Sequence, residues 1–226
     1  MEIVVFPSAA KNSGIAGFCA SAYKTWHRVW EDAFRNQFDL PEKVIDPDEF
    51  SRQSFWVGAF DTGHCAALVG YRLVDLAPSS TCKDSWFNLI PDGILRATLA
   101  ERGRRGILIN NATVDFRYRG LTGRQLLYTL VLAGNALALR VGFDKMLSIT
   151  NDSKGIDRIC STTGGTALRS EIHVYNVMAT FFEFLPADVK KALASAPAHI
   201  IDVVKKNKKL IKEEDIYYEF RKPVVA

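Results

Sequence analysis

The sequence predicts an α/β fold in which helices pack on a mixed β-sheet. The β-branched run Ile107–Val114 (ILINNATV) leads through a glycine- and arginine-bearing turn into a helical segment, and Lys145–Thr150 (KMLSIT) then resumes an apolar strand. Earlier in the chain, the strand-like runs Ser54–Phe60 and Cys65–Leu76 are joined by the segment DTGH, which is typical of a hairpin turn. A hairpin and a strand–helix–strand unit in one chain indicate a sheet that contains both kinds of strand pairing.

Four more elements are predicted before the central strand. Met1–Pro7 is expected to be a short strand, and Leu40–Phe50 an acidic loop interrupted by proline. A helix is expected around Trp86–Ala100. Gly14–Phe38 is predicted to be an amphipathic helix, because apolar side chains recur along one side of it: Phe18, Ala22, Trp26, Val29, Trp30 and Phe34.

The C-terminal half continues the alternation of helices and strands. The helix after the turn shows one buried face, formed by Leu126, Leu127, Leu130, Val131, Leu137, Ala138 and Val141. Asn151–Gly165 is predicted to be helical, Thr166–Phe184 rich in strands, Asp188–Lys206 helical and Ile216–Lys222 a last strand. We predict one domain over residues 1–226, with a helical and basic C-terminal extension over about 187–226 that includes the solvated patch Lys205–Lys212.

Composition excludes several classes of protein. The formal net charge of +4 is too small to indicate a nucleic-acid partner. The N-terminus lacks the basic start and long apolar core of a signal peptide, and no apolar run reaches the length of a membrane span. The four cysteines are scattered without metal-ligand spacing, so we expect reduced thiols, no bound metal and a cytoplasmic location.

The turn after the central strand, Asp115–Arg124 (DFRYRGLTGR), has the composition of an anion site. The first N–H groups of a helix have no partner inside it, and glycines let a ligand approach the backbone closely. Arg117, Arg119 and Arg124 would add positive charge for a phosphate. On composition alone, a tight turn with solvated arginines is the favoured alternative, because loose Gly/Arg patterns match by chance.

The segment VDFRYRGLTGRQLL resembles the pyrophosphate-binding strand, loop and helix of the GNAT acyltransferase superfamily. The resemblance implies a three-layer α/β/α fold with a central mixed sheet, whose central strand splays from its neighbour after Val114. It also implies that these residues hold a coenzyme A or carrier-protein phosphopantetheine: Val114, Arg117, Arg119, Gly120, Thr122, Gly123 and Arg124.

Over roughly residues 20–175, the chain also resembles the acyl-homoserine-lactone synthases and the N-acyl amino acid synthases. The segments that match the families' motifs in order are Trp26–Trp30 (WHRVW), Ile45–Phe50 (IDPDEF), Val69–Leu73 (VGYRL) and Cys82–Ile90 (CKDSWFNLI). The long helix and the strand and helix after it are similar as well. Two positions differ: the families' helix arginine falls at Trp26, and their strand glutamate falls within Leu108–Ala112, where this chain has two asparagines.

The resemblance implies an N-acyltransferase that moves an acyl group from an acyl carrier protein or acyl-CoA thioester to the amine of a small acceptor. The acceptor would be an amino acid or a molecule like S-adenosylmethionine, and the product an autoinducer of the quorum-sensing type. The thioester is a co-substrate, and no permanently bound cofactor is expected.

For the chemistry we expect direct transfer, with Asn110, Asn111 or Asp48 holding the water that takes the proton. Asparagine can orient a water or an amine but cannot itself accept a proton at neutral pH. Arg72, inside an apolar strand, needs a carboxylate partner, and Asp46, Asp48 and Glu49 are candidates. The resemblance favours Asp48, because its distance of 24 positions from Arg72 is close to the families' Asp-to-Arg spacing. The pair would shape the amine pocket or bind the carboxylate of the acceptor. Further substrate-binding residues are Trp26, Trp30, Asp46, Ser148 and Thr150.

Two other functions fit the same residues. One is an acetyl-CoA-dependent GNAT acetyltransferase acting on a small amine or a protein. The other is a GNAT-fold binding protein without catalytic activity, which the asparagines at the strand position favour.

Overall fold

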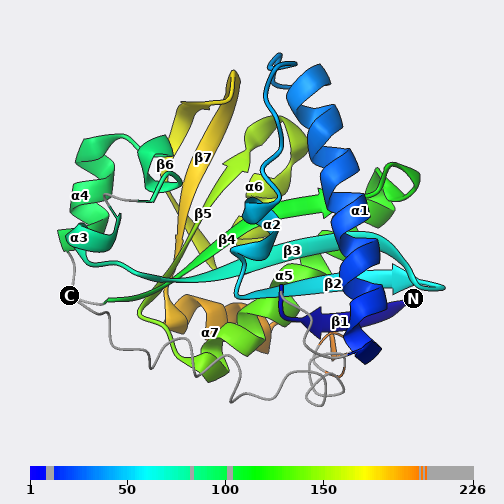
Figure 1. Cartoon of the computed structure of the whole chain (residues 1–226). Helices are drawn as coiled ribbons and strands as arrows, with labels where there is room; N and C mark the ends of the chain where they lie inside the picture. Colours follow the sequence, from blue (N-terminus) through cyan, green and yellow to red (C-terminus); the bar gives the residue numbers. More distant parts are fainter. Residues whose placement is uncertain (9–12, 82–83, 101–103, 199, 201, 203–226) are drawn as a thin grey trace.

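The computed structural model describes residues 1–8, 13–81, 84–100, 104–198, 200 and 202. Seven strands form one sheet in the order β1-β2-β3-β4-β5-β7-β6 (Figure 1). The strands are β1 Glu2–Phe6, β2 Phe55–Asp61, β3 His64–Asp75, β4 Arg105–Val114, β5 Lys145–Asn151, β6 Gly165–Val174 and β7 Val177–Phe184. Only β4 and β5 pair in parallel, so the prediction of a mixed sheet is confirmed.

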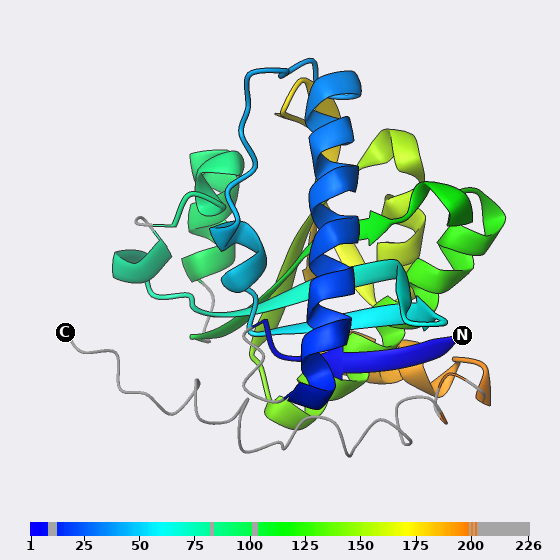
Figure 2. The same ribbon diagram turned by 45° about the vertical axis from the view of Figure 1, so that its right-hand side comes forward.

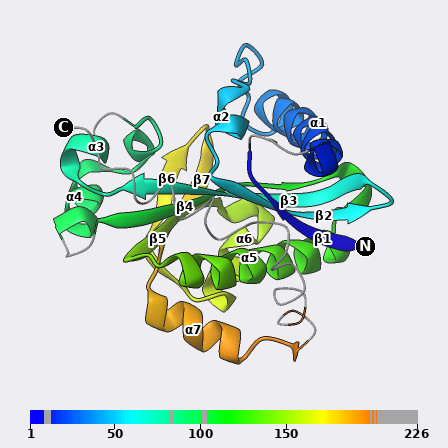
Figure 3. The same cartoon turned by 60° about the horizontal axis from the view of Figure 1, so that its bottom comes forward.

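Helices cover both faces of this sheet, which confirms the three-layer α/β/α prediction (Figure 3). One face carries α1 Ser13–Asn36 and α2 Asp48–Ser51, and the other carries α5 Leu121–Val141, α6 Ile156–Thr162 and α7 Pro186–Ala194. The short α3 Pro78–Thr81 and α4 Asp92–Ala100 lie together at one end of the molecule. Three short 3₁₀ helices are η1 Phe87–Leu89, η2 Phe116–Tyr118 and η3 Asp152–Lys154.

Three of the predicted helices have different bounds in the structure. The one expected around Trp86–Ala100 is split into η1 and α4, because Ile90 before Pro91 is extended and a residue before proline disfavours the helical region. The one expected over Asn151–Gly165 is divided into η3 and α6 by Gly155, whose φ is 68°. Helix α7 ends at Ala194, and the predicted last strand and the basic patch lie outside the described residues.

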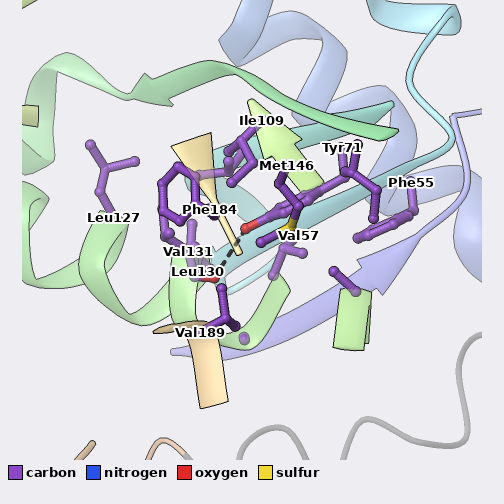
Figure 4. Close-up of a cluster of buried hydrophobic side chains, with 14 of the residues drawn as sticks. Phe55, Val57, Tyr71, Ile109, Leu127, Leu130, Val131, Met146, Phe184 and Val189 are labelled. Atoms are coloured by element: carbon purple, nitrogen blue, oxygen red, sulfur yellow. Dashed lines mark hydrogen bonds between the residues drawn. The ribbon is translucent and has the colours of Figure 1, made fainter. Parts of the chain in front are cut away.

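The larger core lies between the sheet and α5, and Figure 4 shows its central side chains. Tyr71 of β3 is fully buried there, with its ring stacked on Phe55 at 4.8 Å between centroids. Its hydroxyl donates to the Val131 carbonyl at 3.0 Å, and Asn135 Oδ1 lies 3.3 Å away. Burial raises the pKa of Tyr71 well above its usual value, so the hydroxyl stays protonated and attaches α5 to the sheet.

The opposite face of the sheet carries two separate apolar clusters. Under α1 lie Val4, Phe6, Ala22, Trp26, Phe34, Phe50, Trp56, Phe60 and Leu68. Beside η1 and α4 lie Leu76, Phe87, Ile90, Leu108, Leu147, Val174 and Phe181. Arg72 of β3 points to this same face, since side chains alternate along a strand and Leu68 belongs to it. Its guanidinium therefore lies on the face that carries the two clusters.

Strand β4 departs from its parallel neighbour earlier than predicted. It pairs with β5 only from Gly106 to Ile109, whereas the splay was expected after Val114. The physical reason is a β-bulge: Gly70 pairs with Asn110 but Leu68 pairs with Thr113, so β4 carries one more residue than β3 over this stretch. Asn111 in the bulge has φ of 54°, a left-handed conformation that asparagine tolerates better than most residues.

In the described part of the chain, no helix is both long enough and apolar enough to cross a membrane.

A buried ion pair links β5 to β7 and α4. Lys145 Nζ lies 3.1 Å from Glu183 Oε1 and donates to the Thr98 carbonyl at 2.8 Å, and its side chain is 2% exposed. Lys145→Met should lower the free energy of unfolding by about 3–5 kcal/mol, because it leaves the Glu183 carboxylate buried without its cation. Urea unfolding at neutral pH measures this loss.

The matched control is Lys145→Met combined with Glu183→Leu. The double variant should be more stable than Lys145→Met alone, because no unpaired charge remains in the core. Equal losses in the single and double variants would contradict the coupling of the two groups.

Candidate active site

A pocket opens where β4 and β5 separate, and we call it the β4–α5 pocket. It has a volume of about 350 Å³. Its lining includes Val29, Trp30, Phe38, Ala112, Val114, Arg119, Gly120, Gly123, Arg124, Asn151, Lys154 and Ile156. Five of the seven residues predicted to hold the phosphopantetheine of the acyl donor are among them: Val114, Arg119, Gly120, Gly123 and Arg124. Arg117 and Thr122 are not.

The backbone of the β4–α5 turn needs its two glycines. Gly120, at the N-cap of α5, has φ of 88° and ψ of −142°, a region that residues with a side chain rarely adopt. A Cβ on Gly123 would lie 2.6 Å from the Tyr118 carbonyl oxygen and 2.9 Å from Val114. No side chain caps the start of α5, so its first N–H groups and the positive end of its dipole are available to an anion.

Three cations lie at this pocket. Arg119 sits 4.1 Å from the centre of the Phe116 ring and 3.6 Å from an Asp32 carboxylate oxygen, in a partly exposed position. Arg124 has no ion-pair partner among the described residues. Lys154 of η3 completes the set, and no local pattern of residues predicts its role, because only the fold brings the end of β5 to the start of α5. The arrangement suits a phosphate group.

Arg117 has a different position from the one predicted. Its Nε lies 3.2 Å from Asp115 Oδ1, and its backbone N–H donates to the same oxygen at 3.0 Å. The Asp115 side chain is 1% exposed and also pairs with Arg28 of α1 and with His64 Nε2, the latter at 2.9 Å. Asp115 therefore ties the β4–α5 turn to α1 and to the β2–β3 hairpin.

The electrostatics of Asp115 follow from these partners. Burial alone would raise the pKa of its carboxyl, but the hydrogen bonds from Arg117 and His64 and the charge of Arg28 lower it to about 2. The carboxylate is thus ionised throughout the neutral range. No local pattern of residues indicates this cluster, since Arg28, His64 and Asp115 are far apart in the chain.

A second pocket, the α1–β3 pocket, lies between the two apolar clusters on the α1 face of the sheet. It has a volume of about 280 Å³. Its lining includes Trp26, Trp30, Phe34, Phe38, Lys43, Asp46, Glu49, Arg72, Trp86, Asn110, Asn111, Ile149 and Asn151. Trp26, Trp30, Asp46, Arg72, Asn110 and Asn111 were all predicted as site residues, and the fold brings them together here.

Three other predicted residues lie elsewhere. Asp48 is exposed at the start of α2 and does not line the pocket. Ser148 is buried and donates to the Ile109 carbonyl at 2.9 Å, which joins β5 to β4 just before the strands separate. Thr150 is buried and donates to the Thr180 carbonyl at 3.4 Å. Both hydroxyls therefore support the sheet.

The predicted pairing of Arg72 with Asp48 is wrong. Arg72 Nη2 instead lies 2.9 Å from Asp84, and the same carboxylate accepts the Trp86 backbone N–H at 3.0 Å. Asp84 lies in the segment before η1, whereas Asp48 is exposed at the start of α2 and does not line the pocket. Arg72 therefore anchors the segment that carries Trp86, and its side chain remains 10% exposed.

Two buried donors in the α1–β3 pocket have no acceptor. Trp26 Nε1 and Arg72 Nε are both inaccessible to solvent and without a hydrogen-bond partner in the described structure. An unpaired buried donor costs about 1–3 kcal/mol of stability, and a ligand in the pocket reaches neither nitrogen unless a side chain shifts. The carboxylates of Asp46 and Glu49 face the same pocket.

The two pockets are adjacent, because Trp30, Phe38 and Asn151 line both of them. Trp30 belongs to α1, Phe38 follows that helix, and Asn151 is the last residue of β5. Near these residues, the β6–β7 hairpin reaches the C-terminal end of α1 (Figure 2). Asn176 at the hairpin tip donates to the Phe38 carbonyl at 2.9 Å. The separated ends of β4 and β5 thus lie between an anion-binding pocket and a largely aromatic one.

The described thiols are unsuited to nucleophilic catalysis. Burial raises the pKa of Cys65 and of Cys160 to about 12, and it raises the pKa of Cys19 as well. Among the described residues, no cluster of three or more His, Cys, Asp and Glu side chains could bind a metal ion.

Asp115→Asn should destabilise the protein by about 2–3 kcal/mol at neutral pH, because a carboxyl with a native pKa of about 2 contributes that much when its unfolded value is about 4. The contribution is present above pH 4 and is lost as the pH falls towards 2. Urea unfolding of wild type and variant at pH 7 and pH 3 should show the difference shrinking in acid. A pH-independent difference would contradict the role of the carboxylate charge.

Comparison with known proteins identifies solved structures with a similar fold. No family model and no curated protein sequence matches the chain. Among solved structures, the AHL synthase LasI superimposes with a TM-score of 0.59 and 14% identity, over 84% of this chain and 93% of LasI. FeeM, an N-acyl amino acid synthase from uncultured soil microbes, gives a TM-score of 0.50 and 15% identity, over 76% of this chain and 94% of FeeM.

An acyl-CoA N-acyltransferase from Pseudomonas aeruginosa also superimposes, with a TM-score of 0.50 and 11% identity, over 81% of this chain and 98% of that protein. At these identities the likeness concerns the fold. The chain has the GNAT acyltransferase fold and is structurally similar to AHL synthases and to an N-acyl amino acid synthase.

Proposed function

We propose that this protein is an N-acyltransferase that moves an acyl group from a thioester to the amine of a small acceptor. The observation that carries the proposal is the meeting of two chemically different pockets at the point where β4 and β5 separate. One pocket has the charge and backbone geometry for a phosphate, and the other has the Arg72 side chain and aromatic walls.

The donor would occupy the β4–α5 pocket. Its phosphate would lie at the start of α5, near Arg119, Arg124 and Lys154, and its pantetheine arm would follow β4 past Val114 and Ala112. Beyond Ile109 the side of β4 that faces β5 has no paired strand, so its backbone groups are free to bond the amides of that arm. Coenzyme A and an acyl carrier protein both supply this chemistry.

The acceptor would occupy the α1–β3 pocket. A carboxylate on the acceptor would pair with the guanidinium of Arg72, which lines the pocket and whose side chain remains 10% exposed. The aromatic part of the wall offers apolar surface for an acyl chain: Trp30, Phe34, Phe38, Trp86 and Leu89. An amino acid, or a larger molecule that contains an amino acid group, has the required amine and carboxylate.

The reaction we propose is direct. The neutral amine nitrogen attacks the thioester carbonyl carbon, the C–S bond breaks, and the thiolate leaves with the coenzyme or carrier. The amine proton passes through water to Asp46 or Glu49 or to the leaving thiolate. Backbone N–H groups of β4 would stabilise the oxyanion, and holding both substrates in line supplies a large effective molarity.

A product of the autoinducer type fits this arrangement, because LasI is an AHL synthase and FeeM an N-acyl amino acid synthase. An acetyl-CoA-dependent acetyltransferase is the second candidate, but acetyl needs no aromatic pocket of this size. A GNAT-fold binding protein is the third, favoured by the absence of a carboxylate at Asn110 and Asn111.

The direct test is mass spectrometry of the purified protein incubated with acyl-CoA thioesters of increasing chain length and with amino acids or S-adenosylmethionine. We expect an N-acylated product, with longer acyl chains preferred over acetyl. Acetyl transfer alone would favour the second candidate. Binding of thioesters without any product would favour the third.

Arg72→Gln should abolish acylation while leaving thioester binding unchanged, because Arg72 lines only the acceptor side. Its control is Asp84→Asn, which breaks the same ion pair but keeps the guanidinium. Both variants should lose thermal stability, since the pair is partly buried. If Asp84→Asn loses activity as fully as Arg72→Gln, Arg72 serves only to anchor the η1 segment.

The combined variant Arg119→Glu, Arg124→Glu should raise the KM for a CoA thioester at least about tenfold, since each charged hydrogen bond lost costs about 1.5–3 kcal/mol. The effect should be larger at low salt, because salt screens exposed charges. Arg96→Glu, on α4 and exposed, makes half of this change of charge away from the pocket and should leave the KM unchanged. Equal KM values in all variants would show that the arginines are only solvated.

A further inference from the structure

The β4 bulge is connected to α1 by two side-chain hydrogen bonds. Trp30 Nε1 of α1 lies 3.0 Å from Thr113 Oγ1, and Thr113 Oγ1 lies 2.8 Å from the carbonyl oxygen of Asn111. An indole N–H only donates, so the threonine oxygen accepts from Trp30. Its single proton is then available for the Asn111 carbonyl, and the direction of both bonds is determined.

This relay acts on a strained point of the backbone. Asn111 has φ of 54°, and a residue other than glycine held in the left-handed region requires support from its surroundings. The carbonyl of Asn111 has no strand partner on β5, because the β4–β5 pairing ends at Ile109. Thr113 itself is 1% exposed, so water does not replace its hydroxyl easily.

The relay is also placed between the two pockets. Trp30 lines both of them, and the bulged residue Asn111 lines the α1–β3 pocket. The bulge determines which way the β4 N–H groups point at the position where the thioester carbonyl would lie. Fixed donors at that position stabilise the transition state only if their direction is held.

We infer that Trp30 and Thr113 are positioning residues for acyl transfer: they hold the Asn111 bulge so that β4 backbone donors face the thioester carbonyl. The inference rests on the proposed function. Neither side chain supplies a proton or forms a bond in the reaction. They act through the backbone of β4.

The test compares Thr113→Val, which keeps the shape but removes the hydroxyl, with Thr113→Ser, which keeps the hydroxyl. Trp30→Phe removes the indole donor. A matched control is Thr25→Val: Thr25 is also buried on α1, and its hydroxyl donates to the Cys65 carbonyl at 3.1 Å, outside both pockets. For each protein we would measure kcat, the KM for a CoA thioester, the melting temperature and hydrogen exchange of the amides of residues 110–114.

Thr113→Val and Trp30→Phe should lower kcat about tenfold to a hundredfold, somewhat less than the loss of a whole oxyanion donor. The KM for the thioester should change less than about twofold for Thr113→Val, because the variant removes no contact that the enzyme makes equally with the substrate and with the transition state. Amide exchange over residues 110–114 should become faster in both variants. Thr113→Ser should restore kcat, and Thr25→Val should lose melting temperature but keep kcat.

Each contrary result has a distinct meaning. If Thr113→Val keeps its kcat, or loses kcat no more than Thr25→Val does at a similar melting temperature, the positioning role is overturned. Unchanged amide exchange over residues 110–114 would overturn the relay itself, whether or not the protein is active. A wild-type protein that transfers no acyl group, yet shows faster exchange in Thr113→Val, would overturn the proposed function and leave the relay as a structural device only.

Discussion

The separation of β4 from β5 after Ile109 is the constraint on which the rest of the site depends. A parallel pair in the middle of a sheet normally satisfies its backbone groups on both sides, and an unpaired buried group is costly. Here the bulge at Asn111 ends the pairing, and the structure must provide other partners. The Thr113 hydroxyl supplies one of them, and the open side of β4 borders the pocket in which we place the thioester.

Local patterns in the sequence were sufficient for most of the fold. The apolar run Ile107–Val114, the period of the helix after it and the hairpin around residues 61–64 are all short-range signals, and each corresponds to an observed element. The glycines of the β4–α5 turn were also readable, because Gly120 adopts a conformation that glycine favours and Gly123 contacts the Tyr118 carbonyl closely. Element bounds were less accurate where proline or glycine divided a helix, as at Pro91 and Gly155.

The partners of charged side chains were the part that sequence could not determine. Arg72 was assigned to Asp48 by spacing, yet it pairs with Asp84, since the choice depends on which loop folds over β3. Asp115 forms ion pairs or hydrogen bonds with Arg28, His64 and Arg117, which lie in three parts of the chain. Such contacts depend on tertiary packing, and no periodicity of the sequence encodes them. The β4 bulge also depends on tertiary packing. An asparagine at position 111 tolerates the left-handed conformation, but the register between β3 and β4 is what requires it.

The asparagines on β4 are compatible with acyl transfer because the proposed reaction does not need a strong base at that position. An α-amino group has a pKa of about 8, so an appreciable fraction is neutral near physiological pH, and a thiol leaves with a pKa of about 8.5. Once the C–N bond forms, the ammonium proton is far more acidic than that of the free amine and can pass through water to the departing thiolate. A carboxylate on β4 would then add less than the alignment of the two substrates, which can contribute about 7–11 kcal/mol. What the site must provide is therefore fixed geometry, and the connection of α1 to the bulge through Trp30 and Thr113 provides it.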